Sequence, residues 1–186
     1  MILAITGTPG AGKTAVGKEL AKLLGWKFVE LNRIAESKQL YSGYDHARKC
    51  WIVDLKKLQK FAAGLAGNAI MESHYAHELQ ADAIVVLRCK PKQLIARLRK
   101  RGWSKQKIAE NVEAEIMEIC LAEARESGKP VIVADSSGRD AGKTAATIGR
   151  KLAALGRLAG RRASANGKPK QVRGQQSGRK SSAGWP

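Results

Sequence analysis

The chain has 186 residues, of which 44% are hydrophobic and 5% aromatic, so it is long enough for one domain with an aliphatic core. Its three cysteines are far apart and outside any Cys-x-x-Cys pair, which argues against a disulfide framework and a zinc knuckle and indicates a reducing, cytoplasmic-type compartment. No segment is long and apolar enough to span a membrane, and no basic region precedes the apolar start as in a signal peptide.

Charge is the most unusual property, because 34 Lys and Arg residues against 16 Asp and Glu residues give a net charge of +18. Residues 150–186 contain ten basic residues, and no acidic residue follows Asp140. From about residue 161 the composition changes to Gly, Ser, Gln, Lys and Arg with almost nothing apolar. We therefore expect a domain over residues 1–160 and a disordered basic tail over 161–186, which would attract phosphate backbones irrespective of their sequence.

Hydrophobic periodicity, together with Gly and Pro residues at the boundaries, predicts alternating strands and helices. In chain order we expect a strand over 2–6, a helix over 13–25, a strand over 27–31, a helix over 53–67, strands over 68–73 and 83–89, a helix over 91–102, one long helix over 104–128 capped by Ser104, a strand over 130–135 and a last helix from about Ala141 into the 150s. This alternation predicts an α/β fold: a three-layer sandwich around a five-stranded parallel sheet, with ligands at the carboxyl ends of the strands.

Residues 7–14, GTPGAGKT, match the P-loop pattern G-x-x-x-x-G-K-[ST] and lie between a predicted strand and a predicted helix, as the motif requires. The glycines let backbone N–H groups wrap a phosphate, Lys13 reaches the β and γ oxygens, and the Thr14 hydroxyl can ligate magnesium. An ordinary glycine-rich turn is the alternative, and the agreement of pattern and context disfavours it. The similar stretch GRDAGKT at 138–144 has one residue fewer between its glycines, which favours a simple helix start.

A P-loop alone is compatible with an ATPase, a GTPase, a kinase or a translocase, so other segments have to discriminate. Glu72 ends the stretch AIME within the strand predicted over 68–73, where an acidic residue is placed to hold magnesium through water. We expect His74 close to the γ-phosphate, orienting a water or the acceptor; a hydrogen-bonded surface histidine is the alternative. His74 and His77 have a spacing that metal ligands use, but no third and fourth ligand at suitable spacing supports zinc.

The basic stretch RLRKRG at 97–102 precedes the long predicted helix. Such a charge run is most often a solvated face. The alternative is a flexible lid whose arginines close over the transferring phosphoryl group, because a planar guanidinium makes bidentate contacts with phosphate oxygens.

With these motifs in this order, about residues 1–150 resemble the small archaeal and eukaryotic nuclear adenylate kinases of the isoenzyme-six type. The segments that carry the resemblance are GTPGAGKT, LYSGYDHARKCWIVD, ESH and RLRKRGWSKQKIAENVEAEI. The resemblance implies the P-loop NTPase fold of nucleoside monophosphate (NMP) kinases, with an NMP-binding segment over about 30–53 and a lid over about 100–110. It also implies ATP and Mg²⁺ as cofactors and AMP or another NMP as the substrate.

The same resemblance assigns roles to individual residues. ATP phosphates would be bound by Gly10, Gly12, Lys13, Thr14 and Ala15, with Arg101 contacting ATP and Arg139 near the adenine-side loop. Catalysis is expected from Lys13, Arg101 and His74, metal binding from Thr14 and Glu72, and NMP binding from Arg33, Tyr44 and Asp45. Two residues depart from the family pattern: Glu72 replaces the usual Asp, and Glu36 lies near an expected arginine for the acceptor phosphate, for which Arg33 and Arg48 are the candidates.

Two functions remain open from the sequence. The leading hypothesis is transfer of the γ-phosphoryl group from MgATP to AMP or a related NMP, accompanied by ATPase activity. The second is an ATP-driven assembly factor for the small ribosomal subunit, because the resemblance implies a platform ribosomal protein as partner and the basic tail suits rRNA. A shikimate- or gluconate-type kinase fits the P-loop but not LYSGYD or the lid. The location would be cytoplasmic for an archaeal-type chain, or nuclear for a eukaryotic one.

Overall fold

The computed structural model describes residues 1–46, 48, 50–138 and 140–166, and the side chains of these residues up to 156. Residues Met1–Ala153 form one compact unit, and the remainder of the chain is grouped separately. Arg139, which the sequence places near the adenine-side loop, and residues 167–186 of the predicted tail lie outside the described residues. None of the described helices is long and apolar enough to cross a membrane.

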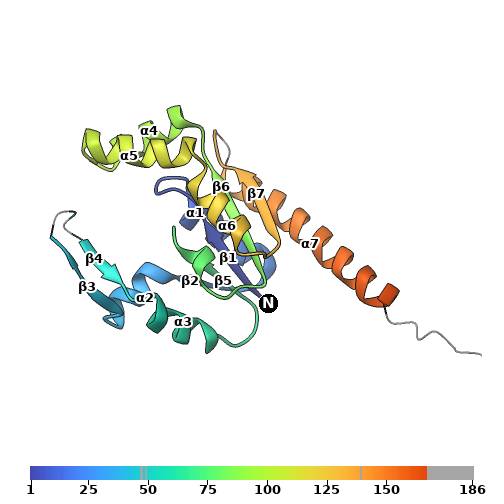
Figure 1. Ribbon diagram of the computed structural model, residues 1–186. Helices are drawn as coiled ribbons and strands as arrows, with labels where there is room; N and C mark the ends of the chain where they lie inside the picture. The colour runs from blue at the N-terminus through green and yellow to red at the C-terminus, as the bar shows by residue number, and fades with distance from the viewer. Residues whose placement is uncertain (47, 49, 139, 167–186) are drawn as a thin grey trace, which may run out of the picture. The chain divides into compact units, whose positions relative to one another are not determined.

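In the described part of the chain, five parallel strands form one sheet in the order β2-β5-β1-β6-β7. The strands are β1 Ile2–Thr6, β2 Lys27–Glu30, β5 Ala69–Glu72, β6 Ala83–Arg88 and β7 Val131–Asp135. This arrangement confirms the predicted α/β fold with a five-stranded parallel sheet, visible in Figure 1. The P-loop strand β1 is central, so the residues after β1, β5 and β6 meet at one edge of the sheet.

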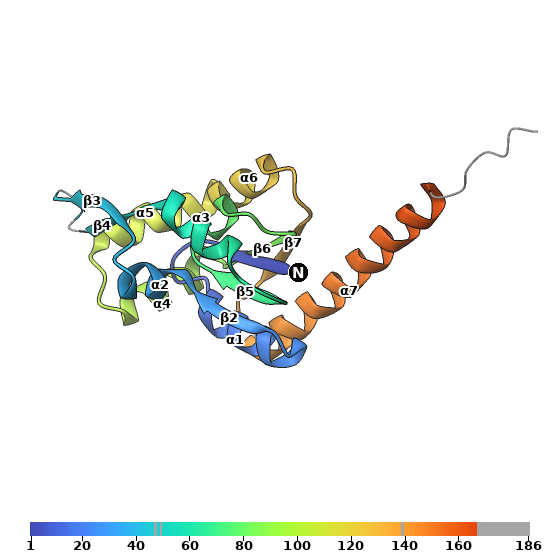
Figure 2. The same ribbon diagram turned by 90° about the horizontal axis from the view of Figure 1, so that it is seen from below.

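Helices lie on both sides of this sheet (Figure 2). They are α1 Lys13–Leu24, α2 Leu31–Ser37, α3 Leu55–Ala63, the short 3-10 helix η1 Ala76–Glu78, α4 Pro91–Lys100, α5 Lys105–Ile116, α6 Ile119–Glu126 and α7 Ala141–Asn166. On one side, α3, η1 and α6 pack against the sheet in one core cluster, and α1 with the start of α7 lies on the other. Strands β3 Tyr41–Asp45 and β4 Cys50–Val53 form a separate antiparallel hairpin.

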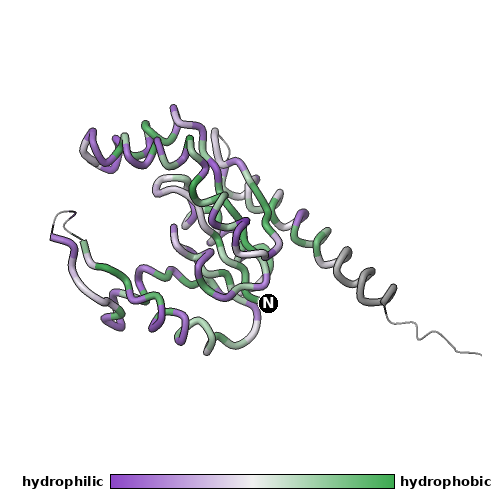
Figure 3. The backbone as a smooth tube through the Cα atoms, in the orientation of Figure 1, coloured by the Kyte–Doolittle hydropathy of each residue, from purple (hydrophilic) through white to green (hydrophobic). Residues whose placement is uncertain are grey.

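The core follows from the residues of the central strands, which are almost entirely aliphatic. Leu3, Ile5, Ile84 and Leu87 are completely buried, as expected for parallel strands covered on both faces. Figure 3 shows hydrophobic residues concentrated in these strands, whereas α4 and α5 carry many hydrophilic ones. Helices α4 and α5 therefore offer less apolar surface for packing than the strands of the sheet do.

The single helix that we expected over 104–128 is divided into α5 and α6, so this prediction was wrong. Its start and end agree with the sequence: the Ser104 hydroxyl accepts a hydrogen bond from Lys107 N, and Gly128 ends the segment with φ 68°. Between them Glu118 adopts φ 57°, a left-handed conformation that ends a helical turn. Glu118 accepts a hydrogen bond from Arg88 at the end of β6, a tertiary contact that periodicity along one helix does not reveal.

The second glycine-rich stretch, GRDAGKT at 138–144, leads into α7. This confirms the helix start that the shorter distance between its glycines favoured. The Asp140 carboxylate accepts from Gly142 N at 2.8 Å and from Lys143 N at 3.3 Å, which caps the first turn. Helix α7 continues to Asn166, past the expected domain end at residue 160.

Candidate active site

The P-loop connects β1 to α1 and depends on glycine at three positive backbone angles: φ is 135° at Gly7, 92° at Gly10 and 92° at Gly12. Two of these positions also have no room for a side chain. A Cβ on Gly7 would lie 2.3 Å from the Leu87 carbonyl oxygen, and one on Gly10 would lie 2.8 Å from Leu98 Cδ2. The loop can therefore curve tightly at the N-terminus of α1, where backbone N–H groups and the helix dipole favour an anion.

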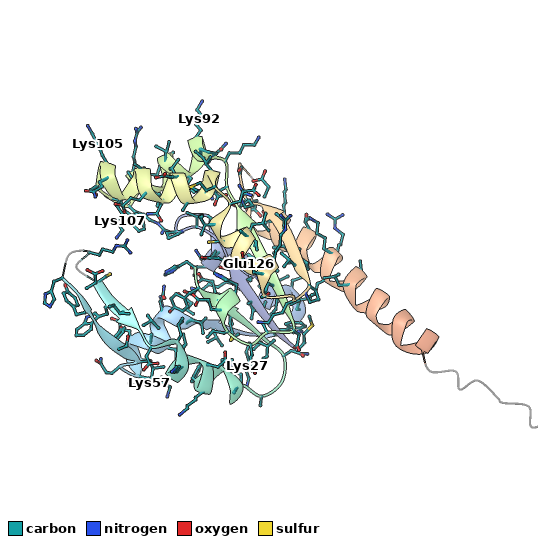
Figure 4. The ribbon with its side chains drawn as sticks, viewed as in Figure 1. Lys27, Lys57, Lys92, Lys105, Lys107 and Glu126 are labelled. Carbon is teal, nitrogen blue, oxygen red and sulfur yellow. The ribbon has the colours of Figure 1, made fainter. Side chains whose placement is uncertain are left out.

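A cavity of about 1090 Å³ lies over this loop. Its walls come from the P-loop and the start of α1, the segment after β5, the tip of the α4–α5 hairpin, the start of α6, and the residues Asn32 and Arg48. Figure 4 shows Lys107 on the side of α5 that faces this space, whereas Lys92 and Lys105 point away from it. The volume is sufficient for nucleotide-sized ligands.

Lys13 lies inside the curve of the P-loop, where it is almost completely buried. Its Nζ donates to the carbonyl oxygens of Gly7 at 2.7 Å and Thr8 at 3.3 Å. Burial lowers the pKa of Lys13, and the negative charge of nearby Glu72 partly opposes that shift. An anionic phosphate in the loop would compensate the ammonium group for the water that it has lost.

Glu72 lies at the end of β5, in register with Ile5 of the P-loop strand, as the sequence predicted. Its Oε2 accepts a hydrogen bond from Thr14 Oγ1 at 3.0 Å, so the longer side chain still reaches the P-loop. The hydroxyl and carboxylate oxygens of these two residues fit Mg²⁺, which is usually held by one or two protein oxygens together with phosphates and waters. A bound magnesium ion would neutralise negative charge on the phosphate oxygens.

The two histidines after Glu72 have different environments. His77 is buried, its Nδ1 lies 2.9 Å from Thr6 Oγ1, and its Nε2 lies 3.0 Å from a Glu123 carboxylate oxygen. His77 thus joins β1 to α6. Among the described residues, no group of three or more His, Cys, Asp and Glu side chains is placed to hold a metal ion. His74 is exposed and lines the cavity, and its pKa is lowered to about 4 by desolvation first and then by electrostatic interaction with Lys13 and His77.

Two arginines of the α4–α5 hairpin have different surroundings, which the sequence did not separate. Arg101 lines the cavity together with Trp103 and Lys107, and its contact with ATP stays a prediction. Arg97, one helical turn earlier, instead donates to Ser136 O at 2.8 Å and to Gly10 O at 3.3 Å, which ties α4 to the P-loop. The packing of α4 against the P-loop turns Arg97 toward the loop and leaves Arg101 in the cavity wall, and the sequence does not show this packing.

The residues expected to bind the NMP do not line this cavity. Arg33 pairs with Glu30 at 3.2 Å, Tyr44 packs its ring against Trp51, and Asp45 accepts from Arg48 N at 2.9 Å. Arg48, the other candidate for the acceptor phosphate, does line the cavity. Whether these residues contact the NMP during turnover stays a prediction.

Asn32 also lines the cavity, and sequence reasoning missed it because no motif marks it. Its Oδ1 accepts hydrogen bonds from Tyr75 OH at 2.7 Å and from Ser73 Oγ at 3.3 Å. These contacts occupy the carbonyl end of the amide, which leaves the Nδ2 donors available to a ligand. Hydrogen bonds to Ser73 and Tyr75 therefore fix the position of the Asn32 amide, whose Nδ2 group is a hydrogen-bond donor on α2.

A parallel sheet with a glycine-rich phosphate loop, a buried lysine, a hydroxyl paired with a carboxylate and an arginine in the cavity wall defines a P-loop phosphotransferase. The model of a protein family described as an AAA domain matches residues 3–118. A Methanosarcina mazei protein named "Putative adenylate kinase" is 38% identical over 167 residues, covering 80% of this chain and 85% of that protein. The protein of the same name from Pyrococcus furiosus is 40% identical over 140 residues, covering 75% of this chain and 77% of that protein.

The chain therefore belongs to the family of these archaeal adenylate kinases. Solved structures show the same fold at low identity. A shikimate kinase from Acinetobacter baumannii has a TM-score of 0.63 at 17% identity, covering 83% of this chain and 93% of that chain. A deoxyadenosine kinase from M. mycoides has a TM-score of 0.53 at 21% identity, covering 83% and 100%.

Proposed function

We propose that this protein transfers the γ-phosphoryl group of MgATP to AMP or a related nucleoside monophosphate. The observation that carries the proposal is that one cavity combines the P-loop, lid Arg101, and the acceptor-side groups Asn32 and Arg48. A phosphate donor on the P-loop and an acceptor near Asn32 would then lie in the same space. The names of the archaeal relatives support the assignment to adenylate kinase.

The reaction is an in-line displacement with little covalent work for the protein. An oxygen of the acceptor monophosphate attacks the γ-phosphorus while the bond to the oxygen bridging the β and γ phosphorus atoms breaks, which gives two nucleoside diphosphates. The P-loop N–H groups and Lys13 hold the donor phosphates, and Arg101 neutralises charge that develops on the transferred group. Magnesium, when held near Thr14 and Glu72, supplies further neutralisation. Closure of the lid would exclude water.

The test is to incubate the protein with MgATP, with and without AMP, and to measure ADP and free phosphate separately. Formation of two ADP per AMP consumed, without free phosphate, is the expected result. Lys13→Met should abolish turnover, whereas Lys22→Met, on the exposed side of the same helix, should not. Free phosphate without AMP consumption would contradict the assignment of AMP as acceptor. Near-normal activity of Lys13→Met would contradict the role of the P-loop.

A second candidate activity is ATP hydrolysis, which the environment of His74 favours. Its lowered pKa of about 4 keeps the imidazole neutral at neutral pH, so one ring nitrogen can accept a hydrogen bond from a water in the cavity. The measurement is phosphate release from MgATP in the absence of an acceptor. His74→Gln should reduce this release more than it reduces transfer to AMP, and equal reductions would argue against a water-orienting role.

The charge distribution supports a role in assembly of the small ribosomal subunit as a further proposal. Residues 150–186 carry ten basic and no acidic residues, which suits rRNA and, by resemblance, a platform ribosomal protein as partners. RNA binding should then weaken steeply with salt and be lost when residues 161–186 are deleted. Binding that is insensitive to salt or independent of this segment would contradict the proposal.

A further inference from the structure

Glu115 is a buried carboxylate that lies outside the cavity lining. It occupies the last turn of α5 with 3% of its surface exposed. Its Oε1 accepts from Arg88 Nε at 2.6 Å and from Cys89 N at 3.0 Å, and its Oε2 accepts from the Thr8 hydroxyl. One side chain therefore connects a lid helix, the end of β6 and the P-loop.

Stability alone does not account for a carboxylate at this position. A negative charge near the C-terminus of a helix interacts unfavourably with the helix dipole, and burying it costs solvation even when an arginine is nearby. Arg88 compensates the charge, and it also binds Glu118, the left-handed residue that separates α5 from α6. Glu115 is thus held by several specific contacts, and one of them is the hydrogen bond from Thr8 of the phosphate loop.

The other lid helix is attached to the same loop. Arg97 of α4 donates to the carbonyl oxygens of Gly10 and Ser136. Both legs of the α4–α5 hairpin are therefore anchored on the P-loop, at Gly10 and at Thr8. The tip of this hairpin carries Arg101, which lines the cavity.

We propose that Glu115 is a positioning residue that couples the conformation of the P-loop to the position of the lid. When phosphate groups bind the loop backbone, a displacement of Thr8 is passed through Glu115 to α5 and from there to Arg101 at the lid tip. Coupling of this kind is reciprocal, so lid closure also stabilises the phosphate-bound loop. The inference uses the proposed function only in taking ATP as the ligand of the loop.

The decisive comparison is Thr8→Val against Thr8→Ser, because valine removes the hydroxyl at nearly constant shape and serine retains it. Trp103 reports on the lid because it lies between α4 and α5 and lines the cavity. The measured quantity is the fluorescence change on adding a non-hydrolysable ATP analogue with Mg²⁺, taken as the part that Trp103→Phe abolishes. The wild type and Thr8→Ser should show this change. Thr8→Val should still bind the analogue, although more weakly because the lid no longer stabilises the loaded loop, should lose most of the fluorescence change, and should show kcat about tenfold lower.

Glu115→Gln tests the other end of the same contact. Its carbonyl can still accept from Arg88 and Cys89 N, while its amide replaces the oxygen that accepts from Thr8. The double variant with Thr8→Val should be no worse than either single variant, because both remove one link. Glu113→Gln, an exposed carboxylate on the same helix, is the matched control and should behave as the wild type.

Three outcomes would overturn the proposal: a Thr8→Val that behaves like Thr8→Ser, effects of Thr8→Val and Glu115→Gln that multiply, or a Thr8→Val that no longer binds the analogue. If Glu115→Gln does not fold, the comparison of Thr8→Val with Thr8→Ser still tests the proposal. A wild type that forms no ADP from MgATP and AMP would refute the proposed function. The Trp103 response to the analogue would nevertheless test the coupling separately.

Discussion

Adding one methyl group to the first glycine of the P-loop, Gly7→Ala, should be severely destabilising. Gly7 has φ 135°, which L-residues rarely adopt, and a Cβ there would lie 2.3 Å from the Leu87 carbonyl oxygen. Real Cβ atoms essentially never come closer than 3.0 Å, so the loop and β6 would have to separate by about 0.7 Å. Leu87 cannot retreat easily, because β6 lies between β1 and β7 in the sheet.

The expected magnitude is the sum of two costs. A backbone angle of φ 135°, outside the left-handed helical region, costs an alanine about 1–3 kcal/mol, and forcing an extra methyl group into a packed site costs about 1–3 kcal/mol. Gly7→Ala should therefore lose roughly 2–6 kcal/mol, a large part of the typical 5–15 kcal/mol of a domain. Gly25→Ala is the comparison variant, because Gly25 is in the left-handed helical region with φ 67° and has nothing within 4 Å of its Cβ, so it should lose only a backbone cost of about 1–2 kcal/mol.

Urea denaturation followed by circular dichroism would measure the free energy of unfolding of both variants, with an unchanged m-value as the check on two-state behaviour. Gly7→Ala should be less stable than Gly25→Ala by about 1–3 kcal/mol, chiefly because of the close contact. Equal losses in the two variants would show that the contact with Leu87 is unimportant and would refute this account of the loop.

Three further predictions concern the cavity. Arg101→Ala should lower kcat by about 10²–10³-fold in steady-state assays, because a cation that neutralises the transferring group is lost; a loss confined to KM would contradict this role. Asn32→Asp should raise KM for AMP about tenfold while KM for ATP stays nearly constant, because a carboxylate replaces the Nδ2 donors, and equal changes for both nucleotides would count against an acceptor-side position. The pKa of His74 is lowered from 6.5 to about 4, so its neutral form persists above pH 4 and is lost below. Activity that needs neutral His74 should show no step near pH 6.5 and should fall only toward pH 4, as a pH–rate profile of the wild type and His74→Gln can establish.

Much of the fold and the phosphate site could be predicted because their determinants are local. Aliphatic runs predicted the strands of the sheet, and the spacing of glycines, Lys13 and Thr14 predicted the phosphate loop. The position of Glu72 beside Thr14 also followed, since parallel neighbouring strands end at the same edge. The helix break at Glu118 did not follow, because Arg88, thirty positions earlier, forms the contact there.

The amino-acid sequence by itself determined the parallel sheet and the chemistry of the loop, because backbone freedom and hydrophobic period act over a few residues. Tertiary structure alone decided that Asn32 and Arg48, rather than Arg33 and Tyr44, line the cavity. It likewise decided that Glu115 supports the loop from outside. Such assignments depend on how helices and a hairpin are rotated against the sheet, and small rotations exchange side chains of equal chemistry between a ligand site and the protein surface.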